Sequence, residues 1–437
     1  MFQPTDGRRL ACFRILFGLL MVWEVWRYFD HGWVERYYIE PEFFFTYYGF
    51  DWVRPWGGMW MKVHFVVLGV LATFIALGFL YRWSMALFFV GFAHIFLIDQ
   101  TNYLNHFYFI TLLSFLMILA PAHRQLSIDA WLRPNLRSQV IPVWSLWMLR
   151  LQIGIVYFYG GLAKLNSDWL GGQPMGMWLS EYGDVRLVGV FFETTAAAYL
   201  FSYGGLLLDL FIFPMLLWRR TLPFAFLLAT AFHLMNAALF NIGIFPWMMI
   251  ATLVLFLPAS RDALPHRQMA FNLTKLLAAL LAIFFVFQLL MPLRHHLYAS
   301  DVKWSEEGHL FSWRMKLNDR EATHLLFVVS DAEGGLHWEV NLEDYLTRRQ
   351  IHQMSTRPDM ILQFAHYVGN LVQSESEADF AELQVQAQVL VSLNGREPAW
   401  LIDPDANLLA EPRDLTPADW ILPSNGPVAQ ELIEEGR

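Results

Sequence analysis

Long apolar stretches recur along the first two thirds of the chain, and polar connections separate them. A helix needs about 20 mostly apolar residues to cross the hydrocarbon core of a bilayer. Nine stretches come close to that length: 10–27, 63–81, 83–99, 104–120, 144–162, 196–218, 221–238, 243–259 and 270–291. The pattern predicts a polytopic α-helical membrane protein with about nine transmembrane helices.

The pattern changes near residue 293, after which charged residues are frequent. Short segments there carry strand, turn or helix signals: strands at 325–329 and 338–341 around a turn at 331–335, a strand at 384–393, and an amphipathic helix at 359–372. The last of these strands ends at Asn394-Gly395, a strong signal for a two-residue hairpin. We therefore expect a transmembrane domain over 1–293 and a small soluble α+β domain over 294–437.

Arginines alternate between the two sides of the predicted spans. If the N-terminus is cytoplasmic, every inner segment is basic, whereas the short outer connections at 101–104 and 238–241 have no Arg or Lys. The inner arginines are Arg8, Arg9, Arg82, Arg124, Arg133, Arg137, Arg219, Arg220, Arg261 and Arg267. With nine spans, the C-terminal domain is then extracytoplasmic.

Composition agrees with a membrane protein and argues against a nucleic-acid-binding protein and a disulfide-bonded one. Hydrophobic residues make up 56% of the chain and charged residues only 16%, which lies outside ordinary soluble composition. The net charge of -9 leaves no basic patch, so nucleic acid is not an expected partner. Cys12 is the single cysteine, which excludes an intramolecular disulfide. The first apolar stretch lacks a small-residue cleavage site, so we expect it to be retained as a span.

Some polar side chains fall within or beside the predicted spans, where an unpaired charge is costly and therefore marks a candidate functional site. Asn105-His106, Lys164, and His233 with Asn236 all lie near the outer ends of their spans in this orientation. We expect them to converge on one cavity open to that side.

Lys164 follows the fifth span in apolar and aromatic surroundings. Desolvation disfavours an ammonium group, so a lysine in such a place gives up its proton easily and becomes a general base. The alternative is a lysine that extends to the lipid headgroups and pairs with Asp168, four residues further on. The spacing leaves both interpretations open.

The other ionisable residues carry weaker signals. A histidine near a helix end, such as His106 or His233, is often only hydrogen-bonded to the backbone. No His or Cys pair has metal-ligand spacing, so a metal site is not predicted. Arg14 with Glu24, and Asp209, are interpreted as structural charges inside the bundle.

At these residues the sequence resembles the vitamin K-dependent gamma-glutamyl carboxylase family, over most of the chain. The most specific block is Phe232-His233-Leu234-Met235-Asn236. Other positions that match include Leu10-Ala11-Cys12-Phe13-Arg14, Asn105-His106, Lys164-Leu165, Asp168-Trp169, Gly204-Gly205, Phe311-Ser312-Trp313-Arg314-Met315, Asp359-Met360 and Ile402-Asp403-Pro404.

The resemblance implies a carbon–carbon lyase, a carboxylase coupled to the epoxidation of vitamin K hydroquinone. Lys164 would deprotonate the reduced, menaquinone-like quinone and His106 would assist. Reaction with O2 would then give a strong base that removes a γ-proton from a peptide glutamate, the carbanion would capture CO2, and the quinone would leave as its epoxide. Such a base requires a cavity that excludes water, so the bilayer and a Glu-containing peptide or protein are the expected partners.

The resemblance also places the binding residues. Asn105, His233, Met235 and Asn236 are expected to bind the quinone, between aromatic walls drawn from Phe107 to Phe109 and from Phe240. Ser312, Trp313 and Met315 of the outer domain are expected to bind the peptide.

Departures from the family leave alternatives open. A single cysteine cannot form the disulfide of animal members, and Asn318 stands where they carry a histidine. The chain resembles shorter bacterial relatives, which suggests a bacterial inner membrane with a periplasmic C-terminal domain (lumenal in a eukaryote). The alternatives are a quinone epoxidase that does not carboxylate protein, and a non-catalytic quinone-binding protein or transporter. The inverted repeats of a transporter are not visible in the sequence.

Overall fold

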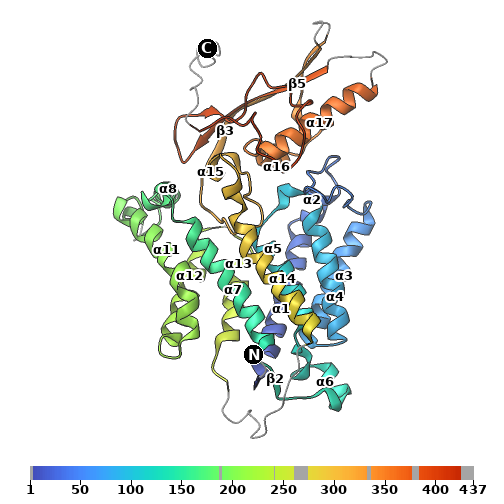
Figure 1. The fold of residues 1–437 in the computed structure, drawn as a ribbon, viewed down its shortest axis with the longest axis vertical. Coiled ribbons are helices and arrows are strands. Elements are labelled where there is room, and N and C mark those ends of the chain that lie inside the picture. Colours follow the sequence, from blue (N-terminus) through green and yellow to red (C-terminus); the bar gives the residue numbers. More distant parts are fainter. Residues whose placement is uncertain are drawn as a thin grey trace.

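The computed structural model describes residues 3–186, 189–240, 242–259, 274–331, 336–375 and 383–424. Within these ranges the chain forms an elongated body of helices with a smaller sheet-containing region at one end (Figure 1). The N-terminal strand lies at the opposite end of the helical body (Figure 1). The two terminal regions are therefore separated by the length of the helices.

The helical body contains a helix at each predicted apolar stretch. These helices are α1 (Arg8–Asp30), α3 (Met59–Leu77), α4 (Tyr81–Leu97), α5 (Asn105–Leu119), α7 (Trp144–Ala163), α11 (Thr195–Leu217), α12 (Leu222–Leu239), α13 (Phe245–Thr252) continued by η4 (Leu253–Phe256), and α14 (Lys275–Leu290) continued by η6 (Met291–Leu297). Residues 270–273 of the last predicted stretch lie outside the described residues. The boundary expected between 293 and 294 falls inside η6 and stays a prediction.

Nine spans are not confirmed. In the described part of the chain, five helices are long and apolar enough to cross a membrane: α3, α7, α11, α12, and α14 with η6. Three others, α4, α5, and α13 with η4, are apolar but shorter. The predicted stretches 104–120 and 243–259 are longer than their helices, because flanking apolar residues were counted as helix, whereas α4 has the 17 residues of its stretch. The α1 helix is long enough, but it carries charged residues at both ends and in its middle.

Short elements connect these helices. They are β1 (Pro4–Asp6), α2 (Trp33–Tyr38), η1 (Gln100–Asn102), η2 (Ala122–Arg124), α6 (Ile128–Leu132), η3 (Pro134–Leu136), β2 (Val140–Pro142), α8 (Ser167–Leu170), α9 (Met175–Ser180) and α10 (Gly189–Phe192). The β1 strand pairs antiparallel with β2, which ties the start of the chain to the entry of α7.

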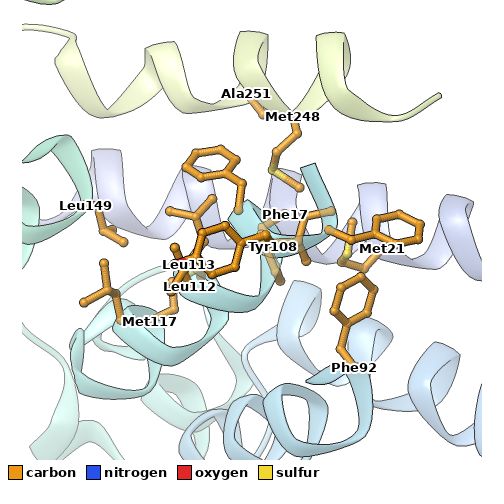
Figure 2. Close-up of a cluster of buried hydrophobic side chains, with 14 of the residues drawn as sticks. Phe17, Met21, Phe92, Tyr108, Leu112, Leu113, Met117, Leu149, Met248 and Ala251 are labelled. Atoms are coloured by element: carbon orange, nitrogen blue, oxygen red, sulfur yellow. The ribbon is translucent and has the colours of Figure 1, made fainter. Parts of the chain in front are cut away.

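A continuous apolar core joins α1, α4, α5, α7 and α13 (Figure 2). Its labelled members include Phe17, Met21, Phe92, Tyr108, Leu112, Leu113, Met117, Leu149, Met248 and Ala251. The α1 and α3 helices approach closely at Gly18, where an added Cβ atom would lie 2.5 Å from the backbone nitrogen of Ala76. Only glycine permits that approach, so α1 is fixed against its neighbour.

The C-terminal region is an antiparallel sheet with helices on it, as the sequence predicted. Its elements are α15 (Val302–Ser305), β3 (Arg320–Asp331), β4 (His337–Glu339), η7 (Leu342–Asp344), α16 (Arg348–Met354), α17 (Pro358–Glu375), β5 (Leu383–Leu393) and β6 (Ala399–Trp400). The strand order is β4-β3-β5-β6. The predicted strands and amphipathic helix are confirmed, although residues 332–335 of the predicted turn lie outside the described residues. The long pairing of β3 with β5 was not predicted.

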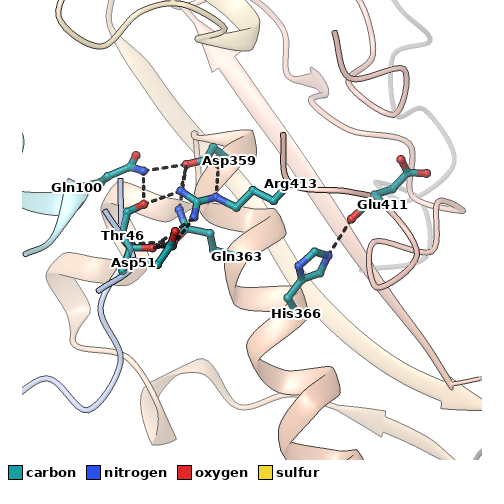
Figure 3. A network of polar contacts seen from close by, with 8 residues as sticks. All are labelled: Thr46, Asp51, Gln100, Asp359, Gln363, His366, Glu411 and Arg413. Atoms are coloured by element: carbon teal, nitrogen blue, oxygen red, sulfur yellow. Dashed lines mark hydrogen bonds and ion pairs between the residues drawn. The ribbon is translucent and has the colours of Figure 1, made fainter. Parts of the chain in front are cut away.

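Charged and amide side chains fasten this region to the loop between α2 and α3 (Figure 3). The guanidinium of Arg413 donates to Asp359 over 2.8 Å and to Asp51 over 3.1 Å. The amide of Gln100 donates to Asp359 over 2.9 Å and to the carbonyl of Thr46 over 2.6 Å. The helical body and the sheet region are thus joined by specific polar contacts as well as by apolar packing.

Candidate active site

A cavity of 730 Å³ lies between the helical body and the C-terminal region, and both line it. Seven of the nine predicted site residues are in its wall: Asn105, His106, Lys164, His233, Met235, Asn236 and Met315. The convergence expected for His106, Lys164 and His233 is therefore confirmed.

Lys164 is the C-terminal cap of α7 and is 8% exposed. Its Nζ donates to the carboxylate of Asp209 over 2.5 Å and to the carbonyl of Gly160 over 3.2 Å. The ring centre of Trp169 lies 5.3 Å from the same nitrogen. The ammonium, carboxylate and aromatic face therefore form one buried group at the cavity wall.

Glycines in α7 allow this pair to form. A Cβ atom at Gly161 would lie 2.8 Å from the side chain of Leu210 in α11, and one at Gly160 would lie 3.4 Å from the Asp209 carboxylate. Without side chains at these positions, α7 and α11 approach closely enough for Lys164 to reach Asp209.

One sequence interpretation of these charges is wrong. Lys164 does not pair with Asp168, because the chain turns into α8 after α7 and directs Asp168 toward the C-terminal region. Asp209 is a buried charge of the helical body, as expected, and it is also the partner of Lys164 and lines the cavity.

Arg14 and Glu24 do not form the charge set that was expected. They lie ten residues apart on α1, about 15 Å along the helix axis, which is too far for an ion pair. Arg14 is fully buried and donates to backbone carbonyls of Ile75 and Ala76. Glu24 instead pairs with Arg27 over 2.6 Å, and both line the cavity.

The histidines lie on separate helices. His233 is 1% exposed, and its Nε2 is 2.7 Å from the hydroxyl of Tyr157 on α7. Its Nδ1 has no hydrogen-bond partner among the described residues. His106 packs between the rings of Phe107 and Phe245, at centroid distances of 4.9 and 5.9 Å.

Ser312 and Trp313 do not line the cavity. The hydroxyl of Ser312 donates to the carbonyl of His309, and Trp313 is fully buried against the ring of Tyr108. They hold the backbone that leads to Arg314. The side-chain amide of Asn105 donates to the carbonyl of Arg314 over 3.1 Å. Any part in peptide binding is therefore through the backbone they position.

Two family models match successive parts of the chain. The model of the HTTM domain matches residues 2–260, and that of the vitamin K-dependent gamma-carboxylase lumenal domain matches residues 273–426. The chain belongs to the vitamin K-dependent gamma-carboxylase family. No solved structure gives a significant match to it. Membership implies an enzyme with a carboxylase-like function that uses vitamin K, O2 and CO2 and acts on Glu-containing substrates.

The part of the wall formed by the carboxylase lumenal domain carries charged residues that the sequence analysis missed. Glu306 lies 2.9 Å from Arg320 and 3.4 Å from Arg357. Burial alone would raise the pKa of Glu306, but the charges of Arg320, His309 and Arg357 outweigh it and lower that pKa to about 2. Burial lowers the pKa of His309 to about 4. At neutral pH this cluster therefore holds two cations around one carboxylate.

Positive charge is in excess over the whole cavity, with seven basic side chains against four acidic ones. The basic ones are Arg27, Lys164, Arg314, Lys316, Arg320, Arg349 and Arg357, and the acidic ones are Glu24, Asp209, Glu306 and Asp319. Arg314, Lys316 and Arg349 have no ion pair with a carboxylate among the described residues. Their sequence signal was weak, because cations after the last span look like ordinary surface charges.

The deeper wall, formed by the helices of the HTTM domain, suits a quinone. Phe107, Phe232, Phe245 and Met249 line it, and so do the predicted Met235 and Phe240. Phe109 lies outside the lining and packs against Trp313. The unpartnered Nδ1 of His233 and the amine of Lys164 supply polar groups beside these apolar side chains. The residues present therefore fit a flat apolar molecule with oxygen substituents.

Proposed function

We propose that this protein carboxylates glutamate in a peptide with CO2 and couples that reaction to the O2-dependent epoxidation of a reduced, menaquinone-like quinone. The observation that carries the proposal is the buried Lys164–Asp209 pair in a cavity lined by both family domains. The bound quinone, on reacting with O2, supplies a base strong enough to take a γ-proton from glutamate.

Lys164 acts at the quinone. The carboxylate of Asp209, 2.5 Å away, holds Nζ in place and is near enough to take one proton from the ammonium group. The neutral amine that this leaves on Lys164 accepts the proton of a quinol hydroxyl. His106 assists from α5, while His233, fixed by Tyr157, faces the quinone.

The C-terminal region holds the peptide. Arg314, Lys316 and Arg349 line the cavity without a carboxylate partner among the described residues, and a glutamate side chain supplies one. Met315 lies between two of these cations and close to Gly160 of α7. The glutamate and the quinone thus meet where the two regions face each other.

Labelled CO2 tests the proposal. Purified protein in nanodiscs, given reduced menaquinone, O2, labelled CO2 and a Glu-containing peptide, is expected to form epoxide and to put label into the peptide. Epoxide without label would favour the alternative of a quinone epoxidase, for which the presence of Asn318 in the cavity wall is the supporting observation. If neither epoxide nor labelled peptide forms, the remaining alternative is a non-catalytic quinone-binding protein.

We also propose that the N-terminus is cytoplasmic and that the C-terminal region is extracytoplasmic, on the periplasmic side of a bacterial inner membrane. In a Cys12→Ser background, an impermeant maleimide added to intact spheroplasts is expected to label Glu343→Cys, which is exposed in the C-terminal region. The matched control, Asn135→Cys, is exposed on η3 near the N-terminal end and should react only after permeabilisation. The reverse labelling pattern would overturn the orientation.

A further inference from the structure

Asp168 is bound by three side chains of the C-terminal region. It lies four residues after Lys164, and it is 8% exposed. Its carboxylate accepts hydrogen bonds from Lys303 Nζ over 3.2 Å and from Asn394 Nδ2 over 3.1 Å, and it pairs with the guanidinium of Arg396. One carboxylate of the helical body therefore fastens α15 and the turn after β5.

That turn also holds the cavity wall. The backbone N–H of Asn394 donates to the carbonyl of Asp319 over 2.8 Å, and the N–H of Asp319 donates to Asn394 Oδ1 over 2.8 Å. Asp319 lines the cavity, three residues after Lys316. The turn thus connects Asp168 directly to the segment that carries Arg314 and Lys316, which have no carboxylate partner among the described residues.

On its other side, Asp168 is fixed relative to Lys164. The side chain of Asn166 accepts hydrogen bonds from the backbone N–H groups of Asp168 and Trp169, both over 3.1 Å. The ring of Trp169 lies against Lys164 and its Nε1 donates to the carbonyl of Ser202 over 2.7 Å. The Asp168 carboxylate and the Lys164 amine consequently belong to one rigid unit.

We propose that Asp168 is a positioning residue that couples the two reactions, because it fixes the peptide-binding segment relative to Lys164. This inference rests on the proposed function. Epoxidation requires Lys164 and Asp209, which both belong to the helical body, whereas carboxylation also requires the peptide glutamate at the right distance. A misplacement of about 1 Å costs roughly 10²-fold in rate, so a loosened segment affects carboxylation and leaves epoxidation nearly intact.

A general weakening of the interface between the two regions is the competing explanation, and the chain offers a matched control for it. Arg413 joins the same two regions through its ion pair with Asp51, and it binds Asp359 within the C-terminal region (Figure 3), but it does not line the cavity. Arg413→Gln removes the ion pair across the interface without altering a side chain that contacts Asp168.

The test compares Asp168→Asn with Arg413→Gln and with the unaltered protein in nanodiscs. For Asp168→Asn, we expect the ratio of labelled peptide to epoxide to fall at least about tenfold, with a higher KM for the peptide and epoxidation within about twofold. Hydrogen exchange in the turn at 394–396 should also become faster. Asn394→Ala with Arg396→Gln, which alters the other side of the contact, should reproduce this result.

An unchanged ratio for Asp168→Asn would overturn the inference. So would an equal fall for Arg413→Gln, or a parallel loss of both activities. If the unaltered protein makes epoxide but labels no peptide, the proposed function itself fails, and the coupling role fails with it. Measuring the unaltered protein in the same assay distinguishes the two failures.

Discussion

Replacing Lys164 by alanine is expected to lower the rate of quinone epoxidation by about 10²- to 10⁴-fold, the usual contribution of a general base. In the structure, no other amine stands at this wall of the cavity with an adjacent carboxylate among the described residues. The loss should appear in kcat, because the apolar walls that hold the quinone remain. Epoxide formation in nanodiscs at saturating reduced quinone measures it.

Lys62→Ala provides the control for removing a lysine. Lys62 pairs with Glu35 over 2.5 Å, as Lys164 pairs with Asp209, but at an exposed position away from the cavity. Its epoxidation rate should stay close to that of the unaltered protein. If Lys164→Ala epoxidises quinone at the rate of the unaltered protein, Lys164 is not the base.

Replacing Asp209 by alanine is expected to reduce the free energy of unfolding by about 3–5 kcal/mol, because it leaves a buried cation without its partner. Asp209 is 7% exposed and Lys164 8%, so water does not replace the lost contact. The measurement is the free energy of unfolding in mixed detergent micelles, compared with the unaltered protein.

The double variant Lys164→Ala with Asp209→Ala distinguishes two causes of the lost stability: the unpaired buried charge and the lost packing of the side chain. With both charges absent, much of the stability lost in Asp209→Ala should return, and the cycle should give a coupling energy of about 0.5–3 kcal/mol. Additive losses in the two single variants would mean that the pair is not coupled in the folded protein. That result would contradict the arrangement on which the proposed proton transfer depends.

Much of the site was predictable because its residues are polar where the sequence is apolar. His106, Lys164 and His233 stood out for that reason, and they line one cavity, as expected. Pairing was not predictable in the same way. Asp209 is 45 residues from Lys164 in the sequence, and only the close approach of α7 and α11 brings the two together.

Three cations of the cavity, by contrast, could not be recognised from the sequence. Arg314, Lys316 and Arg349 lie in a segment rich in charge, where a basic residue is usually a solvated surface group. Arg314 stands beside the predicted Met315, but nothing in the local sequence of Lys316 or Arg349 indicates that they face a cavity. The docking of the sheet region on the helices gives them that environment, so only the folded chain identifies them.

The sequence by itself determined the family, the helical membrane body, the α+β character of the C-terminal region and the polar residues to examine. The family follows from the resemblance of its motifs, and the other features follow from local composition and periodicity, since hydrophobic burial and hairpin turns depend on neighbouring residues. The tertiary structure decided which charges pair and showed that Ser312 and Trp313 lie outside the cavity. It also showed that Asp168 binds the C-terminal region and does not pair with Lys164. Such pairings depend on contacts between distant segments, and a single sequence contains no local signal for them.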